Sequence, residues 1–271
     1  MTQRTDYSSH ASHSPYTPAH VPALAQRLDR ALVDAGLIES RTKAHQAIAA
    51  CQVRVNDQIV VKSSTVVQPG DHLSVDLGEH YVSRGALKLA GAFEAFLPHG
   101  LPDVAGLDCL DIGASTGGFT DVVLRRGARR VIALDVGHGQ LNDRIAADSR
   151  VYEMDGINIR DVTADDLPFQ PQYVVSDVSF ISLTYVIPAI ASLLRQPASC
   201  ILLVKPQFEV GRTRLGHHGI VASQTLREEA LHKVIDCARD HGFVIRESAP
   251  SPIEGTHGNA EYLLWVDFPK N

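Results

Sequence analysis

The sequence predicts an α/β protein in which a small α+β unit precedes a larger unit with a mostly parallel sheet. Two observations carry this prediction. From about residue 107 onward, short β-rich runs alternate with helical segments, as in successive βαβ units. Before residue 78, two short amphipathic helices precede a hairpin. The length of 271 residues fits two unequal domains.

Composition excludes several classes of protein. Hydrophobic residues make up 44% of the chain and charged residues 21%, which is typical of globular proteins and not of disordered or collagenous ones. No segment approaches the roughly 18 to 20 uncharged apolar residues of a membrane-spanning helix, and the first 20 residues lack the apolar region of a secretory signal. We therefore expect a cytoplasmic protein that does not engage membranes.

The cysteines predict no metal site. They lack a C-x-x-C pair and His partners at ligand spacing, so we expect buried free thiols at Cys51, Cys109, Cys200 and Cys237.

The net charge of −6 would be unusual for a protein whose whole surface gripped nucleic acid, but the charge is uneven. Residues 27–62 carry six Lys or Arg against four Asp or Glu, and a second basic cluster comprises Arg125, Arg126, Arg129 and Arg130. Local basic patches of this kind can bind phosphate within an acidic protein.

Residues 1–24 are rich in Ser, Thr, His and Pro, which predicts a disordered arm. Residues 25–78 form the first unit. Its first helix begins near Arg27 and stops at Gly36, Ser40 caps a second helix, and Asn56-Asp57 marks a turn between two strands. A further strand follows the turn in QPGDHLSVDL.

This unit resembles the S4 RNA-binding domain, through RLDRALVDAGLIESRTKAHQAI, then V-x-V-N, then P-G-D before the last strand. The resemblance implies that Arg41, Thr42 and Lys43 face RNA at the start of the second helix, where the helix terminus and two cations favour phosphate. The alternative is that these are solvated charges. The full set of expected RNA contacts is Arg27, Arg41, Thr42, Lys43, Arg54 and Arg84.

Residues 79–86 are expected to link this unit to a second one over 87–268. Its seven predicted strands lie in LDCLDIGAS, RRVIALDVG, RVYEMDG, YVVSDVSF, SCILLVKPQF, FVIRESA and AEYLLWVDF. Predicted helices include GGFTDVVLRRG, SLTYVIPAIASLLRQ and residues 224–241. The alternation predicts a parallel sheet with helices on both faces, and the last pair of strands should add one antiparallel strand.

A glycine-rich loop follows the first strand of this sheet, the place where doubly wound folds bind ligands. It reads D-x-G-x-x-x-G-G from Asp111 to Gly118 and lacks the spacings of NAD-binding and ATP-binding loops. Asp135 ends the second strand, where an acid can accept hydrogen bonds from ribose hydroxyls. Asp155 is a candidate partner for an adenine amino group, with the backbone of Gly156 to Asn158 as the alternative.

The loop resembles the first motif of class I S-adenosylmethionine-dependent methyltransferases, whereas a purely structural glycine turn is the alternative. The resemblance implies S-adenosyl-L-methionine as cofactor. Its expected binding residues are Asp111, Gly113, Ala114, Ser115, Gly117, Gly118, Phe119, Asp135, Asp155 and Asp177.

Four ionisable residues point toward one site: Lys88, Asp177, Lys205 and Glu261. Asp177 and Lys205 follow parallel strands at their carboxyl ends, at the same edge as the glycine-rich loop. Individually, Lys205 would be interpreted as a surface charge and Glu261 as an ordinary strand residue. Together the four resemble the Lys-Asp-Lys-Glu tetrad of FtsJ-type RNA ribose 2'-O-methyltransferases.

The runs YVSRGALKL, SDVSFISL, VKPQFE and GNAEYLLW, behind an S4 module, look more narrowly like the TlyA family, whose members are also called hemolysins. That resemblance covers about residues 25–268. It implies a Rossmann-like class I methyltransferase that methylates the 2'-hydroxyl of cytidine in ribosomal RNA, with ribosomal RNA or ribosomal subunits as partners. Monomer and homodimer both remain open.

We expect Lys205 to take the proton from the 2'-hydroxyl, since burial and the neighbouring Lys88 both disfavour its charged form. Asp177 would orient Lys205, although its negative charge acts in the opposite direction. Lys88 and Glu261 would hold the hydroxyl. Two alternatives stay open, a membrane-lytic protein and an RNA-binding protein with an inactive methyltransferase fold.

Overall fold

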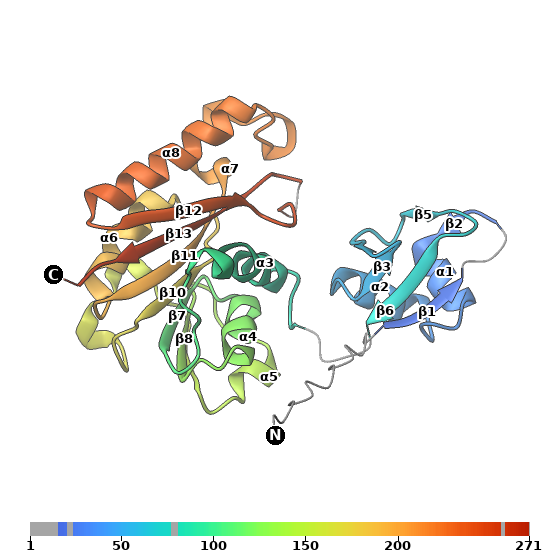
Figure 1. The fold of residues 1–271 in the computed structure, drawn as a ribbon, viewed down its shortest axis with the longest axis horizontal. Helices are drawn as coiled ribbons and strands as arrows, with labels where there is room; N and C mark the ends of the chain where they lie inside the picture. Colours follow the sequence, from blue (N-terminus) through green and yellow to red (C-terminus); the bar gives the residue numbers. More distant parts are fainter. Residues whose placement is uncertain (1–15, 21–23, 77–80, 256–257, 271) are drawn as a thin grey trace, which may run out of the picture. The chain divides into compact units, whose positions relative to one another are not determined.

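The computed structural model describes residues 16–20, 24–76, 81–255 and 258–270 (Figure 1). The chain divides into two compact units, Met1–His80 and Tyr81–Asn271. The first unit has one hydrophobic cluster and the second has two large ones, on opposite faces of its sheet.

The first unit is a small α+β domain. Its elements are β1 (Tyr16–His20), β2 (Gln26–Arg27), α1 (Leu28–Asp34), α2 (Arg41–Ala49), β3 (Val53–Val55), β4 (Gln58–Ile59), β5 (Val66–Val67) and β6 (His72–Asp76). An antiparallel sheet has the order β1-β6-β3-β4, and β2 pairs with β5. Leu28, Leu32 and Ile48 from the helices pack with Leu73 and Val75 of β6 in its core.

The local signals in this unit are confirmed. The Ser40 side chain accepts a hydrogen bond from the Lys43 backbone N–H at 3.3 Å and so caps α2. Gly36 follows α1 with a φ of +69°. Asn56 and Asp57 both adopt left-handed conformations, the geometry that a tight hairpin between β3 and β4 requires.

The prediction of a disordered arm is wrong for residues 16–20, while residues 1–15 and 21–23 lie outside the described part of the chain. Tyr16–His20 forms strand β1, antiparallel to β6. An edge strand of this kind is held by backbone hydrogen bonds and needs few apolar side chains. Pro18 is tolerated in it because edge strands leave some N–H positions unpaired. Low apolar content therefore did not exclude a strand.

The second unit contains the predicted seven-stranded, mostly parallel sheet. Its strands are β7 (Asp108–Ile112), β8 (Arg130–Leu134), β9 (Val151–Met154), β10 (Tyr173–Ser176), β11 (Ala198–Val204), β12 (Val244–Pro250) and β13 (Tyr262–Phe268). The order is β12-β13-β11-β10-β7-β8-β9. Strand β13 is antiparallel to both of its neighbours, as expected from the closing pair.

Helices cover both faces of this sheet (Figure 1). The α-helices are α3 (Ala86–Phe96), α4 (Gly118–Arg125), α5 (Asp143–Ala146), α6 (Leu183–Leu193), α7 (Pro206–Glu209) and α8 (Gln224–Asp240), and 3-10 turns lie at Leu97–His99, Ile159–Asp161, Ala164–Asp166, Arg212–Arg214 and His217–Gly219. Side chains of α3 and α4 pack on one face with Cys109 and Val175, and those of α6 and α8 pack on the other with Leu110 and Val174. Neighbouring strand residues thus alternate between the two cores.

The expected linker over 79–86 extends too far toward the C-terminus, because residues from Tyr81 onward already belong to the second unit. Tyr81 and Val82 pack against the core cluster of the second unit, and α3 already begins at Ala86. These two apolar side chains are partly buried, whereas the side chains of a solvated linker would be exposed. Residues 79 and 80 are outside the described chain. Among the described residues, no helix is long and apolar enough to cross a membrane.

Candidate active site

The candidate active site lies at the edge of the sheet where the parallel strands end. The glycine-rich loop follows β7, Asp177 follows β10, and Lys205 follows β11. Glu261 directly precedes β13, and because β13 runs antiparallel, its start lies at the same edge. Helix α3 brings Lys88 to this edge from the side. The topology therefore gathers all four predicted residues.

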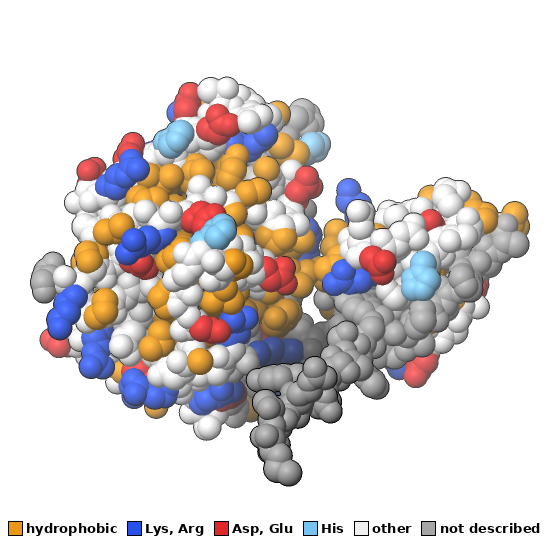
Figure 2. All heavy atoms as spheres, viewed as in Figure 1, with side chains coloured by type: hydrophobic (Ala, Val, Ile, Leu, Met, Phe, Trp, Pro, Cys, Tyr) orange, Lys and Arg blue, Asp and Glu red, His pale blue; other side chains and the backbone are white. Residues whose placement is uncertain are grey.

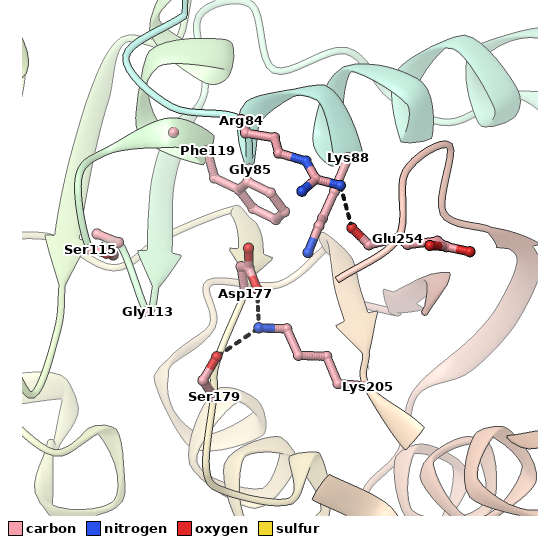
Figure 3. Close-up of a pocket in the computed structure, with 12 residues that line it drawn as sticks. Arg84, Gly85, Lys88, Gly113, Ser115, Phe119, Asp177, Ser179, Lys205 and Glu254 are labelled. Atoms are coloured by element: carbon pink, nitrogen blue, oxygen red, sulfur yellow. Dashed lines mark hydrogen bonds and ion pairs between the residues drawn. The ribbon is translucent and has the colours of Figure 1, made fainter. Parts of the chain in front are cut away.

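Three of the four residues line one cavity of about 250 Å³, together with Arg84, Ser179 and Glu254 (Figure 3). Lys88, Asp177 and Lys205 are the three. Glu261 stands behind Lys88 and is 3% exposed. The cavity also reaches the glycine-rich loop, so the ionisable groups and that loop share one space.

The four residues form two ion pairs. Lys205 Nζ lies 2.6 Å from Asp177 Oδ1 and donates a hydrogen bond to Ser179 Oγ at 2.8 Å. Lys88 Nζ lies 2.5 Å from Glu261 Oε2. Both lysines are 8% exposed. Buried ammonium groups need such partners, since an unpaired charge in this environment would be strongly destabilising.

The glycine-rich loop packs closely against Asp177 and Ser83. Gly113 has a φ of +82°, and a Cβ there would lie 2.8 Å from the backbone carbonyl oxygen of Asp177. A Cβ at Gly118 would lie 2.2 Å from Ser83 Oγ. Glycine at these positions lets the loop backbone reach the cavity without a side chain in the way. The arrangement is a cradle suited to a ligand held by backbone groups.

Asp111 supports this loop from inside the protein. It is fully buried, and Thr120 donates a hydrogen bond to its Oδ2 at 2.7 Å. Burial raises the pKa of the Asp111 carboxyl to about 7, against the lowering effect of the Thr120 hydrogen bond. It lines neither this cavity nor the larger one described next. Any effect on a ligand would therefore pass through the loop.

A second, larger cavity of about 870 Å³ shares Gly113, Ser115, Asp177 and Ser179 with the first. Asp135 lines it and accepts hydrogen bonds from the backbone N–H groups of Ser115 and Gly137, at 2.8 and 2.7 Å. Each carboxylate oxygen has two lone pairs, so both can accept another donor. The position and chemistry of Asp135 thus fit a ribose diol.

The other predicted cofactor residues differ in position. Ala114 and Phe119 line the smaller cavity, whereas Gly117 has a left-handed backbone that starts α4. Asp155 accepts a hydrogen bond from the Gly139 N–H at 3.0 Å and is not among the residues lining the larger cavity. Asn158 and Ile159 line that cavity instead. Asp155 also lines a small hollow together with Asp135, so both alternatives for an adenine contact stay open.

Sequence reasoning missed several residues of this site. Ser179 contacts Lys205, and Glu254 holds Arg84 through its carbonyl oxygen at 2.8 Å. Phe180 is 92% exposed, adopts a φ of +65° and lies beside Phe208 on the larger cavity. Ser179 had a signal, because it stands two residues after Asp177 in an extended segment. Phe180 had none, since its exposure depends on the turn.

In the first unit, three cationic or basic side chains converge on one buried carboxylate. Arg27, Arg41 and His45 all contact Asp29, whose side chain is fully buried, and the Arg41 contact is 2.7 Å long. The Arg27 hydrogen bond is the main cause that holds the pKa of Asp29 well below its usual range. The Arg41 side chain is still 61% exposed. It can therefore also face a phosphate.

The remaining expected RNA contacts are exposed or lie elsewhere. Thr42 is exposed, Lys43 pairs with Glu39 one turn away, and Arg54 donates to the Asp57 carbonyl oxygen at 2.8 Å. Arg84 belongs to the second unit, where it lines the smaller cavity.

The second basic cluster predicted from the sequence consists of paired arginines. The pairs are Arg125–Asp121, Arg126–Asp103, Arg129–Asp108 and Arg130–Asp108. Asp108 begins β7 and Arg130 begins β8, so this cluster lies at the opposite end of the strands from the candidate active site. Over the face of the second unit seen in Figure 2, cationic and anionic side chains are interspersed. Each of these arginines pairs with a carboxylate, and phosphate binding by this cluster stays a prediction.

The four cysteines carry no disulfide. Cys51, Cys109 and Cys200 are buried, as expected, whereas Cys237 is only partly buried. Burial raises the pKa of the Cys109 and Cys200 thiols well above their usual range.

Comparison with known proteins matches both units. The family model of FtsJ-like methyltransferases matches residues 81–268, and that of the S4 domain matches residues 26–73. The 16S/23S rRNA (cytidine-2'-O)-methyltransferase TlyA of Mycobacterium tuberculosis is 43% identical over 242 residues, which cover 89% of each chain. Hemolysin A of Brachyspira hyodysenteriae is 41% identical, over 88% of this chain and 98% of its own. A solved structure from Streptococcus thermophilus, described as a "putative hemolysin", is 37% identical with a TM-score of 0.69, and the match covers 92% of this chain and 90% of that one.

Proposed function

The chain belongs to the TlyA family of FtsJ-like methyltransferases, and we propose that it transfers a methyl group from S-adenosylmethionine to the ribose 2'-hydroxyl of a cytidine in ribosomal RNA. The observation that carries the proposal is the pair of buried Lys–carboxylate contacts beside the glycine-rich loop.

The chemistry requires alignment and removal of one proton. S-adenosylmethionine supplies an electrophilic methyl group, so the protein must orient the ribose hydroxyl and take its proton as the new bond forms. Lys205 is the proposed base, and it acts in the form that has given up a proton. Asp177 and Ser179 hold its Nζ from two sides, which restricts its direction toward the cavity.

Lys88 and Glu261 are proposed to hold the ribose. The Lys88 ammonium group lines the cavity and faces the space where a hydroxyl would enter. Glu261 fixes Lys88 from behind. Because a cation beside the hydroxyl stabilises negative charge that develops on its oxygen, Lys88 also favours loss of the proton.

The cofactor is proposed to occupy the larger cavity next to this space. Asp135 would accept the ribose diol, and the backbone of the glycine-rich loop would contact the rest of the molecule. Phe180 offers an exposed aromatic face at the rim, on which a nucleobase can stack. Arg84, at the edge of the smaller cavity, is suited to a phosphate of the target strand.

The first unit is proposed to bind the same RNA. Its exposed Thr42 and Lys43 stand in the first turn of α2, whose N–H groups favour phosphate. Arg27 and Arg41 add positive charge close to this turn.

A labelling experiment tests the function. Purified protein is incubated with tritiated S-adenosylmethionine and with separate small and large ribosomal subunits, and the modified nucleotide is then mapped. We expect label in a cytidine at its 2'-oxygen. The Lys205→Ala variant is the control, and it should lose at least about 100-fold in rate while its cofactor affinity stays unchanged. Label on a base, or no label on either subunit, contradicts the proposal.

A further inference from the structure

Gln207 lies directly behind the catalytic cluster. It belongs to the short helix α7, which starts immediately after Lys205, with Pro206 at its first position. Its Nε2 donates a hydrogen bond to Glu261 Oε1 at 3.2 Å. The other Glu261 oxygen, Oε2, lies 2.5 Å from Lys88 Nζ. Gln207, Glu261 and Lys88 therefore form one chain of contacts that ends at the cavity.

The negative charge of the Glu261 carboxylate determines which end of the Gln207 amide faces it. An ionised carboxylate is only an acceptor, so Gln207 must turn its NH₂ group toward Glu261. Its Oε1 then faces the opposite way, where it is buried and has no hydrogen-bond partner among the residues that the structure describes. A buried acceptor left in this state is unfavourable. The Gln207 amide thus donates to Glu261 while its own oxygen is left without a hydrogen bond among the described residues.

Glu261 has little freedom to move. It is 3% exposed, and a Cβ at Gly255 would lie 2.5 Å from its Oε1. The backbone at Gly255 therefore closes one side of the carboxylate, while Gln207 and Lys88 occupy its two oxygens. A small rotation of Glu261 would change the position of the Lys88 ammonium group.

We propose that Gln207 is a positioning residue for methyl transfer: it orients Glu261, which in turn fixes Lys88 at the catalytic cavity. Gln207 is not among the residues that line the cavity, so it acts through Glu261 and not on the substrate. This inference rests on the proposed function.

The test compares two variants with the wild-type protein. Gln207→Met keeps the length of the side chain and removes the donor, and Gln207→Glu places a like charge opposite Glu261. Single-turnover rates, KM for ribosomal subunits, cofactor affinity and thermal unfolding are measured. We expect the transfer rate to fall about tenfold for Met and further for Glu, with KM and cofactor affinity within about twofold of wild type.

The matched control is Gln224→Met, which removes an exposed Gln–Glu hydrogen bond, between Gln224 and Glu228 on α8. It should leave the transfer rate unchanged. A double-mutant cycle adds specificity, because in a Glu261→Ala background the Gln207→Met change should have no further effect on the rate.

Three outcomes overturn the inference. One is a wild-type rate of methyl transfer in both Gln207 variants, and another is an equal loss of rate from Gln207→Met with and without Glu261. The third is a loss of rate that is fully explained by a lower unfolding temperature. If the wild-type protein itself fails to methylate either subunit, the proposed function fails instead. The two failures are therefore distinguishable.

Discussion

Asp111 is a carboxyl group whose ionisation opposes folding. Its pKa in the folded protein is raised to about 7, chiefly by burial, whereas an Asp in an unfolded chain titrates near 4. Between these values the folded protein keeps a proton that the unfolded chain has lost. The contribution of Asp111 to stability is therefore fully present below about pH 4 and is lost as pH rises to about 7.

An Asp111→Asn variant tests this sign. The amide oxygen can still accept the Thr120 hydrogen bond, but the side chain no longer ionises. We expect the free energy of unfolding of the variant, relative to wild type, to rise between about pH 4 and pH 7 and to level off above. Urea unfolding at four or five pH values measures it. A difference that does not vary with pH would refute the assignment.

Some residues of the candidate site could be predicted from a short sequence motif, and others could not. Asp177 and Lys205 were predictable because they directly follow β-rich runs at the carboxyl edge of a parallel sheet. Gln207 and Ser179 stand in the same runs, but their contacts depend on the turn that follows each strand. Sequence periodicity does not specify such turns.

At the scale of elements, the loop between β7 and α4 depends on close packing against Asp177. A Gly113→Ala change would bring a Cβ within 2.8 Å of the Asp177 carbonyl oxygen. We expect weaker cofactor binding and slower transfer, because the loop or the Asp177 backbone must shift. Gly106→Ala is a matched control, since Gly106 also has a positive φ, of +74°, but a Cβ there would meet no heavy atom of the described chain within 4 Å.

Both alanine variants should lose about 1 kcal/mol or more of stability from the left-handed backbone. Only Gly113→Ala should lose cofactor affinity in calorimetry. Equal affinities in the two variants would show that the approach to Asp177 is unimportant.

Helix α2 is the element proposed to face RNA, and the structure decides which of its charges can test this. Arg41 is unsuitable, because reversing it would place a carboxylate beside the buried Asp29 and disturb the fold. Lys43 is suitable, because it is exposed and its ion pair is with Glu39, which is itself exposed. Lys43→Glu should weaken binding to ribosomal RNA and reduce its log-log salt dependence by about 0.7 to 0.9 per lost phosphate contact.

Lys270→Glu makes the same change in net charge on an exposed residue of the second unit. It should leave RNA affinity nearly unchanged, and both variants should bind the cofactor normally. If the two reversals weaken RNA binding equally, the effect is one of net charge and α2 has no special part in it.

Elements with a capping, turn or alternation signal were predicted from the sequence, whereas helix α3 and strand β1, which lack such a signal, were not. Ser40 marks the start of α2 and Asn56-Asp57 marks the β3–β4 hairpin. Helix α3 carries Lys88, but its N-cap residue is Gly85, which provides no side-chain cap. The start of this helix therefore had no local signal in the sequence. Strand β1 forms by pairing with β6, about 55 residues later, which a local pattern does not encode.

At the scale of the whole molecule, the two units have separate cores and are proposed to engage one RNA. Each unit matches its own family model, S4 over residues 26–73 and FtsJ-like over residues 81–268. Linking an RNA-binding module to a catalytic one raises the effective concentration of RNA at the active site without any change in chemistry. The first unit should therefore act mainly on kcat/KM for ribosomal subunits.

A chain that begins at Glu79 tests this division of labour. It retains Tyr81 and Val82, which pack in the core of the second unit, as well as Lys88 on α3. We expect it to fold and to bind S-adenosylmethionine with the affinity of the full chain, because the residues lining both cavities all lie in the second unit. Circular dichroism and calorimetry check these two points. Its kcat/KM for ribosomal subunits should fall by about 100-fold or more, since it lacks the proposed phosphate contacts of the first unit. If the shortened chain methylates the same nucleotide with the kcat/KM of the full chain, the first unit does not deliver RNA to the active site.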